Sequence, residues 1–160
     1  MTTSETSPTA ATIRSVPLRT PEQRAAFRHD DLERVASFLH THLDQYGDPL
    51  EHVRAAIMRA VGEGEHDGGT VTVAEIDGDV VGAVVTNDTH LTGYVPENLL
   101  VYVATHAGYR GRGIGKALMR RAVDACDGSI ALHVEPDNPA VALYRSLGFT
   151  NKYLEMRLER

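Results

Sequence analysis

The first half of the chain places hydrophobic residues at the spacing of amphipathic helices. One helical face, within Asp30–Leu43, is formed by Leu32, Val35, Ala36, Leu39 and Leu43. A second helix is predicted to begin at Asp48-Pro49-Leu50-Glu51 and to end in the glycine-rich run Gly62–Gly69. Upstream, Thr20-Pro21-Glu22-Gln23 carries the residues of a capping box, with proline at the first helical position.

After Gly69 the hydrophobic period shortens to that of β-strands. Asp77-Gly78 is a strong signal for a hairpin turn. Helical spacing then returns twice, and Gly128 and Gly148 stand where each helix is expected to end. The predicted strands are Thr70–Ile76, Val80–Thr86, Leu99–Ala104, Ser129–Val134 and Tyr153–Leu158; the predicted helices are Ile114–Cys126 and Pro139–Leu147, and Asn87–Asn98 is a polar loop.

This order of elements predicts an α/β (α+β) fold with a mixed sheet and helices packed on it. A length of 160 residues fits one domain. Residues 1–12 are rich in Thr, Ser and Ala and are expected to form a disordered tail, which leaves 13–160 as the domain. The longest apolar run, Leu99–Ala104, is too short to cross a membrane, and the N-terminus lacks the pattern of a signal peptide.

The charges are distributed unevenly along the chain. Sixteen Lys and Arg against 22 Asp and Glu give a net charge of −6, which argues against nucleic-acid binding by bulk charge. The segment between Asn98 and Val123 has no acidic residue and contains Arg110, Arg112, Lys116, Arg120 and Arg121. The single cysteine, Cys126, excludes an intrachain disulfide and a thiolate zinc cluster.

The first three of these basic residues lie in a glycine-rich turn between a strand and a helix, 109–116. Its glycines allow a sharp turn and close approach of a ligand, and the helix start offers free N–H groups. The turn therefore predicts a phosphate site, against the alternative of a flexible turn with solvated arginines. It does not match a Walker loop, because Arg110 and Ala117 stand at required positions, and Lys116 replaces the third glycine of a dinucleotide fingerprint.

Two motifs, one in this turn and one downstream of it, together resemble a known family. Arg110-Gly111-Arg112-Gly113-Ile114-Gly115 resembles the Arg/Gln-x-x-Gly-x-Gly/Ala loop of the GCN5-related N-acetyltransferase (GNAT) superfamily. The segment 133–149 resembles the second half of that fold and ends in Leu143-Tyr144-Arg145-Ser146-Leu147-Gly148-Phe149, a Leu-Tyr-x-x-x-Gly-Phe signature. The resemblance covers residues 70–160 in detail and residues 20–69 in architecture alone. It implies the GNAT fold: a mostly antiparallel mixed sheet, splayed at the cofactor strand, with helices on both faces.

The resemblance also implies acetyl-CoA as the donor and an amine of a small molecule or peptide as the acceptor. By position, backbone groups of Val103 and Thr105 would bind the pantetheine arm, and Asn138 would reach the same arm. Tyr144 would lie by the sulfur and protonate the leaving thiolate. The pyrophosphate would be held by Arg110, Gly111, Arg112, Gly113, Ile114, Gly115 and Lys116.

The general base is less clearly marked than the acid. Glu97, just before the cofactor strand, stands where several family members carry a glutamate that acts directly or through water. Glu75, His90, His133 and water are alternatives, and no metal site is expected. The acceptor is expected between the first two helices, the 87–98 loop and the central strand. Asp44, Tyr46 and Asp48 are candidates to meet a cation there; helix capping and turn formation are the alternative for all three, and this alternative is favoured for Asp48.

The sequence leaves three classes of function to compare. The first is an acetyl-CoA-dependent N-acetyltransferase, a cytoplasmic enzyme that forms a homodimer, as many family members do. The second is a protein of the same fold that senses acyl-CoA without turnover. The third is a nucleotide-binding α/β domain unrelated to CoA. An intact Tyr144 and an intact loop favour the enzyme.

Overall fold

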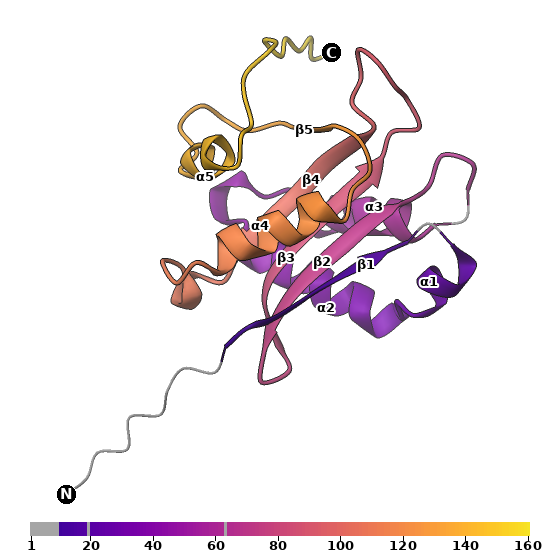
Figure 1. Cartoon of the computed structure of the whole chain (residues 1–160), viewed down its shortest axis with the longest axis vertical. Coiled ribbons are helices and arrows are strands. Elements are labelled where there is room, and N and C mark those ends of the chain that lie inside the picture. Colours follow the sequence, from indigo (N-terminus) through magenta and orange to yellow (C-terminus); the bar gives the residue numbers. More distant parts are fainter. Residues whose placement is uncertain (1–9, 19, 63) are drawn as a thin grey trace, which may run out of the picture.

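A five-stranded sheet forms the centre of the computed structural model, which describes residues 10–18, 20–62 and 64–160 (Figure 1). The strand order is β1-β2-β3-β4-β5. β1 to β4 pair antiparallel in succession, and β5 lies parallel to β4. The strands are β1 (Thr12–Pro17), β2 (Gly69–Ile76), β3 (Asp79–Asp88), β4 (Asn98–Thr105) and β5 (Ile130–Leu132). The mixed sheet confirms the predicted fold class.

The helices cover both faces of this sheet (Figure 1). α2 packs on β3 and β4 and α3 on β2 and β3 from one side, and α4 packs on β1, β2 and β3 from the other. The capping box at Thr20 is confirmed. The Thr20 Oγ1 accepts from the Gln23 N–H at 3.3 Å, and the Gln23 Oε1 accepts from the Thr20 N–H at 3.0 Å. The helices are α1 (Pro21–Ala25), α2 (His29–His42), α3 (Leu50–Val61), α4 (Ile114–Asp124) and α5 (Ala140–Ser146), with short 3₁₀ turns η1 (Asp44–Tyr46) and η2 (Ala107–Tyr109).

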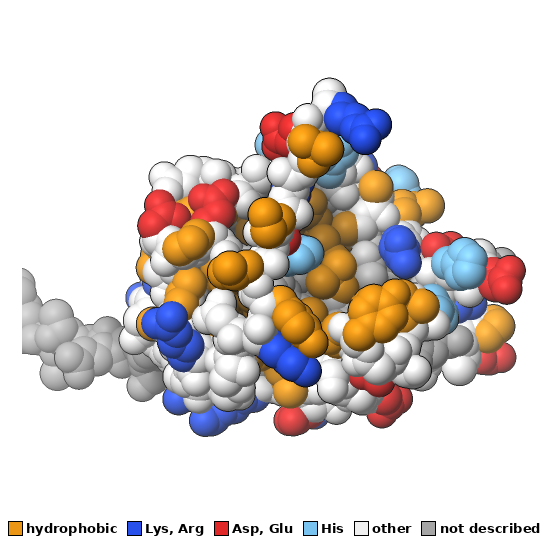
Figure 2. Space-filling view, turned by 90° about the horizontal axis from the view of Figure 1, so that it is seen from above, with side chains coloured by type: hydrophobic (Ala, Val, Ile, Leu, Met, Phe, Trp, Pro, Cys, Tyr) orange, Lys and Arg blue, Asp and Glu red, His pale blue; other side chains and the backbone are white. Residues whose placement is uncertain are grey.

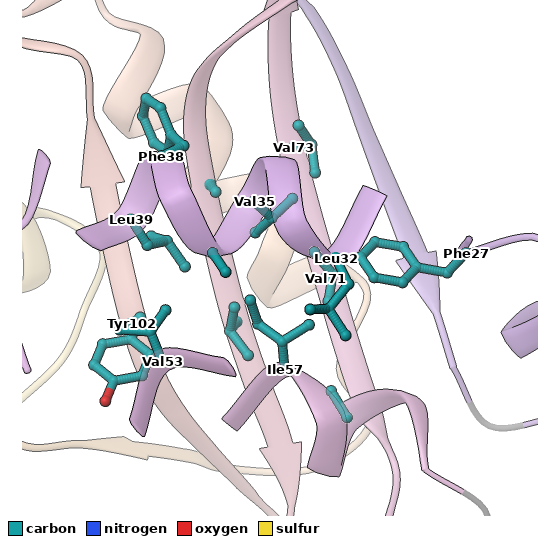
Figure 3. Close-up of a cluster of buried hydrophobic side chains, with 14 of the residues drawn as sticks. Phe27, Leu32, Val35, Phe38, Leu39, Val53, Ile57, Val71, Val73 and Tyr102 are labelled. Atoms are coloured by element: carbon teal, nitrogen blue, oxygen red, sulfur yellow. The ribbon is translucent and has the colours of Figure 1, made fainter. Parts of the chain in front are cut away.

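The hydrophobic core consists of two clusters separated by the sheet. The first lies under α2 and α3 and is drawn in Figure 3. Its members include Leu39, Val53, Ile57, Val71 and Tyr102. The second lies under α4 and α5, where Leu118 and Met119 are fully buried and Tyr144 is 7% exposed. The predicted inward faces of the helices bury these side chains because each sheet face needs an apolar cover.

The N-terminal boundary of the fold differs from the prediction. Residues 1–9, most of the predicted disordered tail, lie outside the described residues. Thr12, the last residue of the predicted tail, begins β1, a strand that the sequence pattern does not predict. β1 pairs antiparallel with β2, with Ile13 opposite Ala74 and Val16 opposite Val71.

The C-terminal boundary also differs, because the predicted strand Tyr153–Leu158 is wrong. In the described part of the chain no strand follows β5, and the segment after α5 is exposed, with Leu154 at 92% and Met156 at 91%. Figure 2 looks onto the end of the molecule where this segment lies, and hydrophobic side chains are visible on its surface. The alternating pattern is present there, but the segment has no neighbouring strand, and a lone strand leaves its backbone groups without partners. No helix among the described residues is long and apolar enough to span a membrane.

Candidate functional site

β4 and β5 are paired over only part of their length. β5 pairs with Asn98, Leu99 and Leu100, and from Val101 to Thr105 β4 has no neighbour on that side in the described structure. The register between β3 and β4 shifts between Val85 and Thr86, so that one residue of β4, Val101, bulges where the pairing with β5 ends. The open side of β4 thus begins at a bulge and continues to the end of the strand, as the predicted splay requires.

The backbone of Val103 and Thr105 faces this open side. The His106 N–H donates to the Val81 carbonyl on β3 at 2.9 Å. N–H groups alternate in direction along a strand, so those of Ala104 and Tyr102 also point toward β3. The N–H groups of Val103 and Thr105 therefore point away from β3, into the gap where β5 is absent. This is the orientation that the predicted contacts with a pantetheine arm need.

The glycine-rich turn leads from the end of β4 into α4. Gly111 and Gly113 have φ of 75° and 80°, a left-handed conformation that glycine adopts without strain. Gly113 is the N-cap of α4 and provides no side-chain cap, so the first N–H groups of the helix remain available to a ligand. A Cβ at either glycine would meet nothing within 4 Å. The turn is open to an anion from outside.

The three basic side chains of the turn do not act alike. Arg110 turns toward the end of α2, where it lies 3.2 Å from Asp44 Oδ2 and donates to the Thr105 carbonyl at 3.1 Å. Arg112 is exposed and lies over the Tyr109 ring at 5.2 Å, and Lys116 is exposed on the first turn of α4. Arg112 and Lys116 are therefore placed beside the helix N-terminus. The Arg110 guanidinium instead ties the turn to the end of α2, a contact that the sequence pattern does not predict.

A series of ring contacts, one tilted and one edge-on, supports this tie between α2 and the turn. The His42 and His106 ring centroids are 4.3 Å apart, and His106 meets Tyr109 at 5.4 Å. Burial, together with the nearby His106, lowers the pKa of His42. The Nδ1 of His106 accepts from the Gly108 N–H at 3.0 Å, which fixes the short turn η2. The rings hold the phosphate-site candidate against the end of α2.

Tyr144 lies on α5 in the second hydrophobic cluster. Its ring is 5.9 Å from that of Phe149, and both belong to the predicted Leu-Tyr-x-x-x-Gly-Phe signature. Burial raises the pKa of Tyr144 to about 12. The phenol is thus protonated throughout the ordinary pH range, which is the state that a general acid requires.

Asn138 has a visible local role at the start of α5. Its Oδ1 accepts from the Ala140 N–H at 2.9 Å, and its carbonyl accepts from the Val141 N–H at 3.1 Å. An asparagine in this position stabilises a helix start by satisfying free N–H groups. The predicted contact of Asn138 with the cofactor stays a prediction, beside this structural role.

Glu97 lies directly before β4, at the end of the strand remote from the glycine-rich turn. Its carboxylate accepts from the Ser129 N–H at 2.8 Å, and this bond holds the pKa of Glu97 below its usual value. Glu97 also lines an open pocket of about 410 Å³. The other residues of that pocket are Asp88, His90, Leu91, Thr92, Asn98 and Asp127.

The other candidate bases are scattered. Glu75 forms ion pairs with Arg14 at 3.4 Å and Arg34 at 3.0 Å. His90 lies in the Glu97 pocket, with Nε2 3.1 Å from the Asp67 carbonyl, and His133 is exposed just past β5. Of these four candidate bases, Glu97 and His90 line the same pocket, and Glu75 and His133 do not line it. Within the described residues no group of three His, Cys, Asp or Glu side chains has the arrangement of a metal site.

The contact of Asp48 with Tyr102 was not anticipated from the sequence. The Tyr102 hydroxyl donates to Asp48 Oδ2 at 2.6 Å, and α3 begins after Pro49 without a side-chain cap. The capping interpretation of Asp48 is therefore wrong. The one available signal was a tyrosine in the otherwise apolar run of β4, since a buried hydroxyl needs a partner.

Comparisons with known proteins test the predicted family. Residues 27–149 match the family model described as Acetyltransferase (GNAT) family. Acetyltransferase SG1711 of Sodalis glossinidius is 32% identical over 132 residues, which are 77% of this chain and 83% of that protein. The N-alpha-acetyltransferase RimI of Mycobacterium tuberculosis is 42% identical over 60 residues, 36% of this chain and 38% of that protein.

A solved structure shows the same fold. The aminoglycoside N-acetyltransferase AAC(6')-Iy in complex with CoA aligns with a TM-score of 0.65 at 15% identity, covering 96% of this chain and 98% of that chain. The family match and the Sodalis relative establish the family: this chain belongs to the GNAT acetyltransferases. The predicted family and fold are confirmed. Acetyl transfer is the general activity that the family match and the Sodalis relative support.

Proposed function

We propose that the protein is an acetyl-CoA-dependent N-acetyltransferase that moves an acetyl group to a primary amine by direct attack on the thioester. One arrangement carries the proposal: the open side of β4 leads from the bulge at Val101 to the glycine-rich start of α4. A long thioester with a phosphorylated end needs such a path, with strand N–H groups at one end and helix N–H groups at the other.

The residues present fit coenzyme A in this path. Gly111 and Gly113 leave space, and the open start of α4 with Arg112 and Lys116 offers N–H groups and positive charge for a pyrophosphate. Backbone groups of Arg110, Ile114 and Gly115 complete the proposed cradle. The N–H groups of Val103 and Thr105 would hold the pantetheine arm, and Asn138 and Tyr144 would border it. When bound, acetyl-CoA supplies an acetyl group activated as a thioester.

The chain's own groups would then do three things. A base removes a proton from the acceptor ammonium, because an alkyl amine with a pKa of about 10.4 is mostly protonated near neutrality. Strand N–H groups near Val103 stabilise the oxyanion of the tetrahedral intermediate, since fixed dipoles need no reorganisation. Tyr144 donates its phenolic proton to the leaving sulfur, whose conjugate acid has a pKa of about 8.5 in the free-cysteine reference.

Glu97 is the proposed base, acting directly or through water. Its place at the start of β4, on an open pocket, supports this role. A lowered pKa makes a carboxylate a weaker base, and Glu97 therefore competes with Glu75, His90, His133 and water.

The acceptor class is proposed from the relatives. RimI is by name an N-alpha-acetyltransferase, and AAC(6')-Iy is an aminoglycoside N-acetyltransferase, so both peptide and small-molecule amines are proposed acceptors. We propose a cytoplasmic location, where acetyl-CoA is supplied, and a homodimer as in many members of the family.

The test is a turnover screen with acetyl-CoA over a panel of amines, read by released thiol. The panel includes polyamines, aminoglycosides, amino acids and peptide N-termini. Thiol release that depends on an amine is expected. In parallel, acetyl-CoA is expected to raise the melting temperature, whereas NAD and ATP are not, because only a ligand of the native state stabilises it. Binding without turnover would leave an acyl-CoA sensor, and absence of binding would exclude both functions.

A further inference from the structure

The side chain of Tyr102 places a polar group on the α2–α3 face of β4. Tyr102 is 7% exposed and belongs to the cluster under α2 and α3, whereas its neighbour Val103 packs with the cluster under α4 and α5. Figure 3 shows the Tyr102 hydroxyl oxygen at the margin of its cluster. The hydroxyl therefore lies across β4 from the helices α4 and α5 that border the proposed CoA path.

Asp48, on the loop between α2 and α3, is the hydrogen-bond partner of the Tyr102 hydroxyl. Its Oδ2 accepts the Tyr102 hydroxyl proton at 2.6 Å, and burial, followed by this hydrogen bond, raises the pKa of Tyr102. The phenol thus serves as donor, and it fixes a carboxylate that is itself on an exposed residue.

Within the described residues the Asp48 carboxylate has no cationic partner. Among the described residues no ion pair joins Asp48 to Lys, Arg or His, and the nearest acid on the same loop, Asp44, is already paired with Arg110 at 3.2 Å. A carboxylate with one oxygen held by a buried phenol and no cation beside it matches an ammonium or guanidinium group, which donates to it with charge assistance.

We propose that Asp48, positioned by Tyr102, binds a positively charged group of the acceptor that is separate from the reacting amine. This inference rests on the proposed acetyl transfer and names its substrate class: diamines, polyamines and other molecules that carry a second cationic group. Asp48 is the residue that touches the substrate, and Tyr102 is a positioning residue.

The test uses cadaverine and its amino-alcohol analogue, in which a hydroxyl replaces one of the two amines. Wild type is expected to have a KM for cadaverine about tenfold or more below that for the amino-alcohol. Asp48→Asn is expected to raise the KM for cadaverine by a similar factor and to leave that for the amino-alcohol unchanged. Glu51→Gln, which removes one exposed negative charge on the first turn of α3, is the matched control and should change neither KM.

Tyr102→Phe separates positioning from packing. It keeps the buried ring and removes the hydroxyl, so the KM for cadaverine is expected to rise several-fold with little change in kcat. In the Asp48→Asn background the same change should have no further effect on KM, because the carboxylate that it positions is gone.

Binding is measured beside turnover, by calorimetric titration of cadaverine into wild type and Asp48→Asn with CoA present. Loss of cadaverine binding in Asp48→Asn supports the inference even if no amine is acetylated. Absence of acetylation would overturn the proposed function but not the inference. Equal cadaverine binding or equal KM in the two proteins, or failure of cadaverine to bind wild type, overturns the inference and leaves acetyl transfer to be judged by the amine panel.

Discussion

Gly115 at the start of α4 lies directly against Thr105 at the end of β4. A Cβ on Gly115 would be 3.2 Å from Thr105 Oγ1, tighter than an ordinary van der Waals contact. The absence of a side chain at Gly115 therefore lets the helix start approach the open strand. This contact joins the two parts of the proposed CoA path, the strand N–H groups and the helix N-terminus.

Gly115→Ala is expected to weaken acetyl-CoA affinity and to give no gain in stability. Alanine in a helix normally stabilises it by about 0.5–1 kcal/mol relative to glycine, and the contact with Thr105 is expected to offset that gain. In a Thr105→Ala background, where Oγ1 is absent, the same Gly115→Ala change should stabilise the protein. Urea unfolding of the four proteins measures this coupling, and identical effects of Gly115→Ala in both backgrounds would contradict the close contact.

Replacing Arg112 and Lys116 by alanine is expected to weaken CoA binding by roughly tenfold or more, because charge-assisted bonds to phosphate are lost. Binding of pantetheine, which lacks the phosphates, should be unaffected. Arg59→Ala on α3 removes one positive charge away from the turn and is the control for each single replacement. Calorimetric titration gives the affinities, and equal losses for CoA and pantetheine would place these two side chains away from the phosphates.

Tyr144→Phe is expected to lower kcat by roughly a hundredfold, the size typical of a lost general acid, with CoA affinity largely retained. The ring stays in place, so its packing against Phe149 is preserved. Steady-state rates and CoA titration of the same preparation check both parts. An unchanged kcat would remove the proposed acid role.

The raised pKa of Tyr144 also predicts a change of stability with pH. Burial raises this pKa to about 12, above the value of about 10 in the unfolded chain, so the native state holds the proton more tightly. The contribution is complete below pH 10 and falls by about 3 kcal/mol as pH rises from 10 to 12. Urea unfolding near pH 8 and near pH 11 should show a larger loss for wild type than for Tyr144→Phe.

Glu97→Gln and Glu97→Ala separate the catalytic and structural roles of Glu97. Glutamine retains an oxygen for the Ser129 N–H, whereas alanine does not. As the base, Glu97 should be required for turnover, so both variants lose kcat, but only alanine should clearly lower the melting temperature. Full activity of Glu97→Gln would assign the base to Glu75, His90, His133 or water.

Local patterns account for most of the fold. The helical faces around Leu39 and Ile57, the capping box at Thr20 and the hairpin turn at Asp77-Gly78 were predictable because each depends on nearby residues. The glycine-rich turn and the segment around Tyr144 were recognisable for the same reason, because the chemistry of each is concentrated in a few consecutive positions.

Features that depend on distant partners were not predictable in this way. β1 forms a strand because its backbone pairs with the edge of β2. The alternating segment Tyr153–Leu158 forms no strand because no strand edge of the described structure lies beside it to pair with. The Asp48–Tyr102 bond joins residues 54 positions apart, and the Arg110–Asp44 pair joins residues 66 apart. A sequence pattern shows the residue types but does not show which distant residues form contacts.

Analysis of the acceptor after incubation with acetyl-CoA and the wild-type protein tests acetyl transfer to an amine most directly. Mass spectrometry of the amine panel is expected to show an acetyl group on a nitrogen of at least one cationic acceptor, and roughly a hundredfold less of this product with Tyr144→Phe over the same time. Unmodified acceptors throughout the panel, with acetyl-CoA bound to the protein, would contradict the assignment as an enzyme.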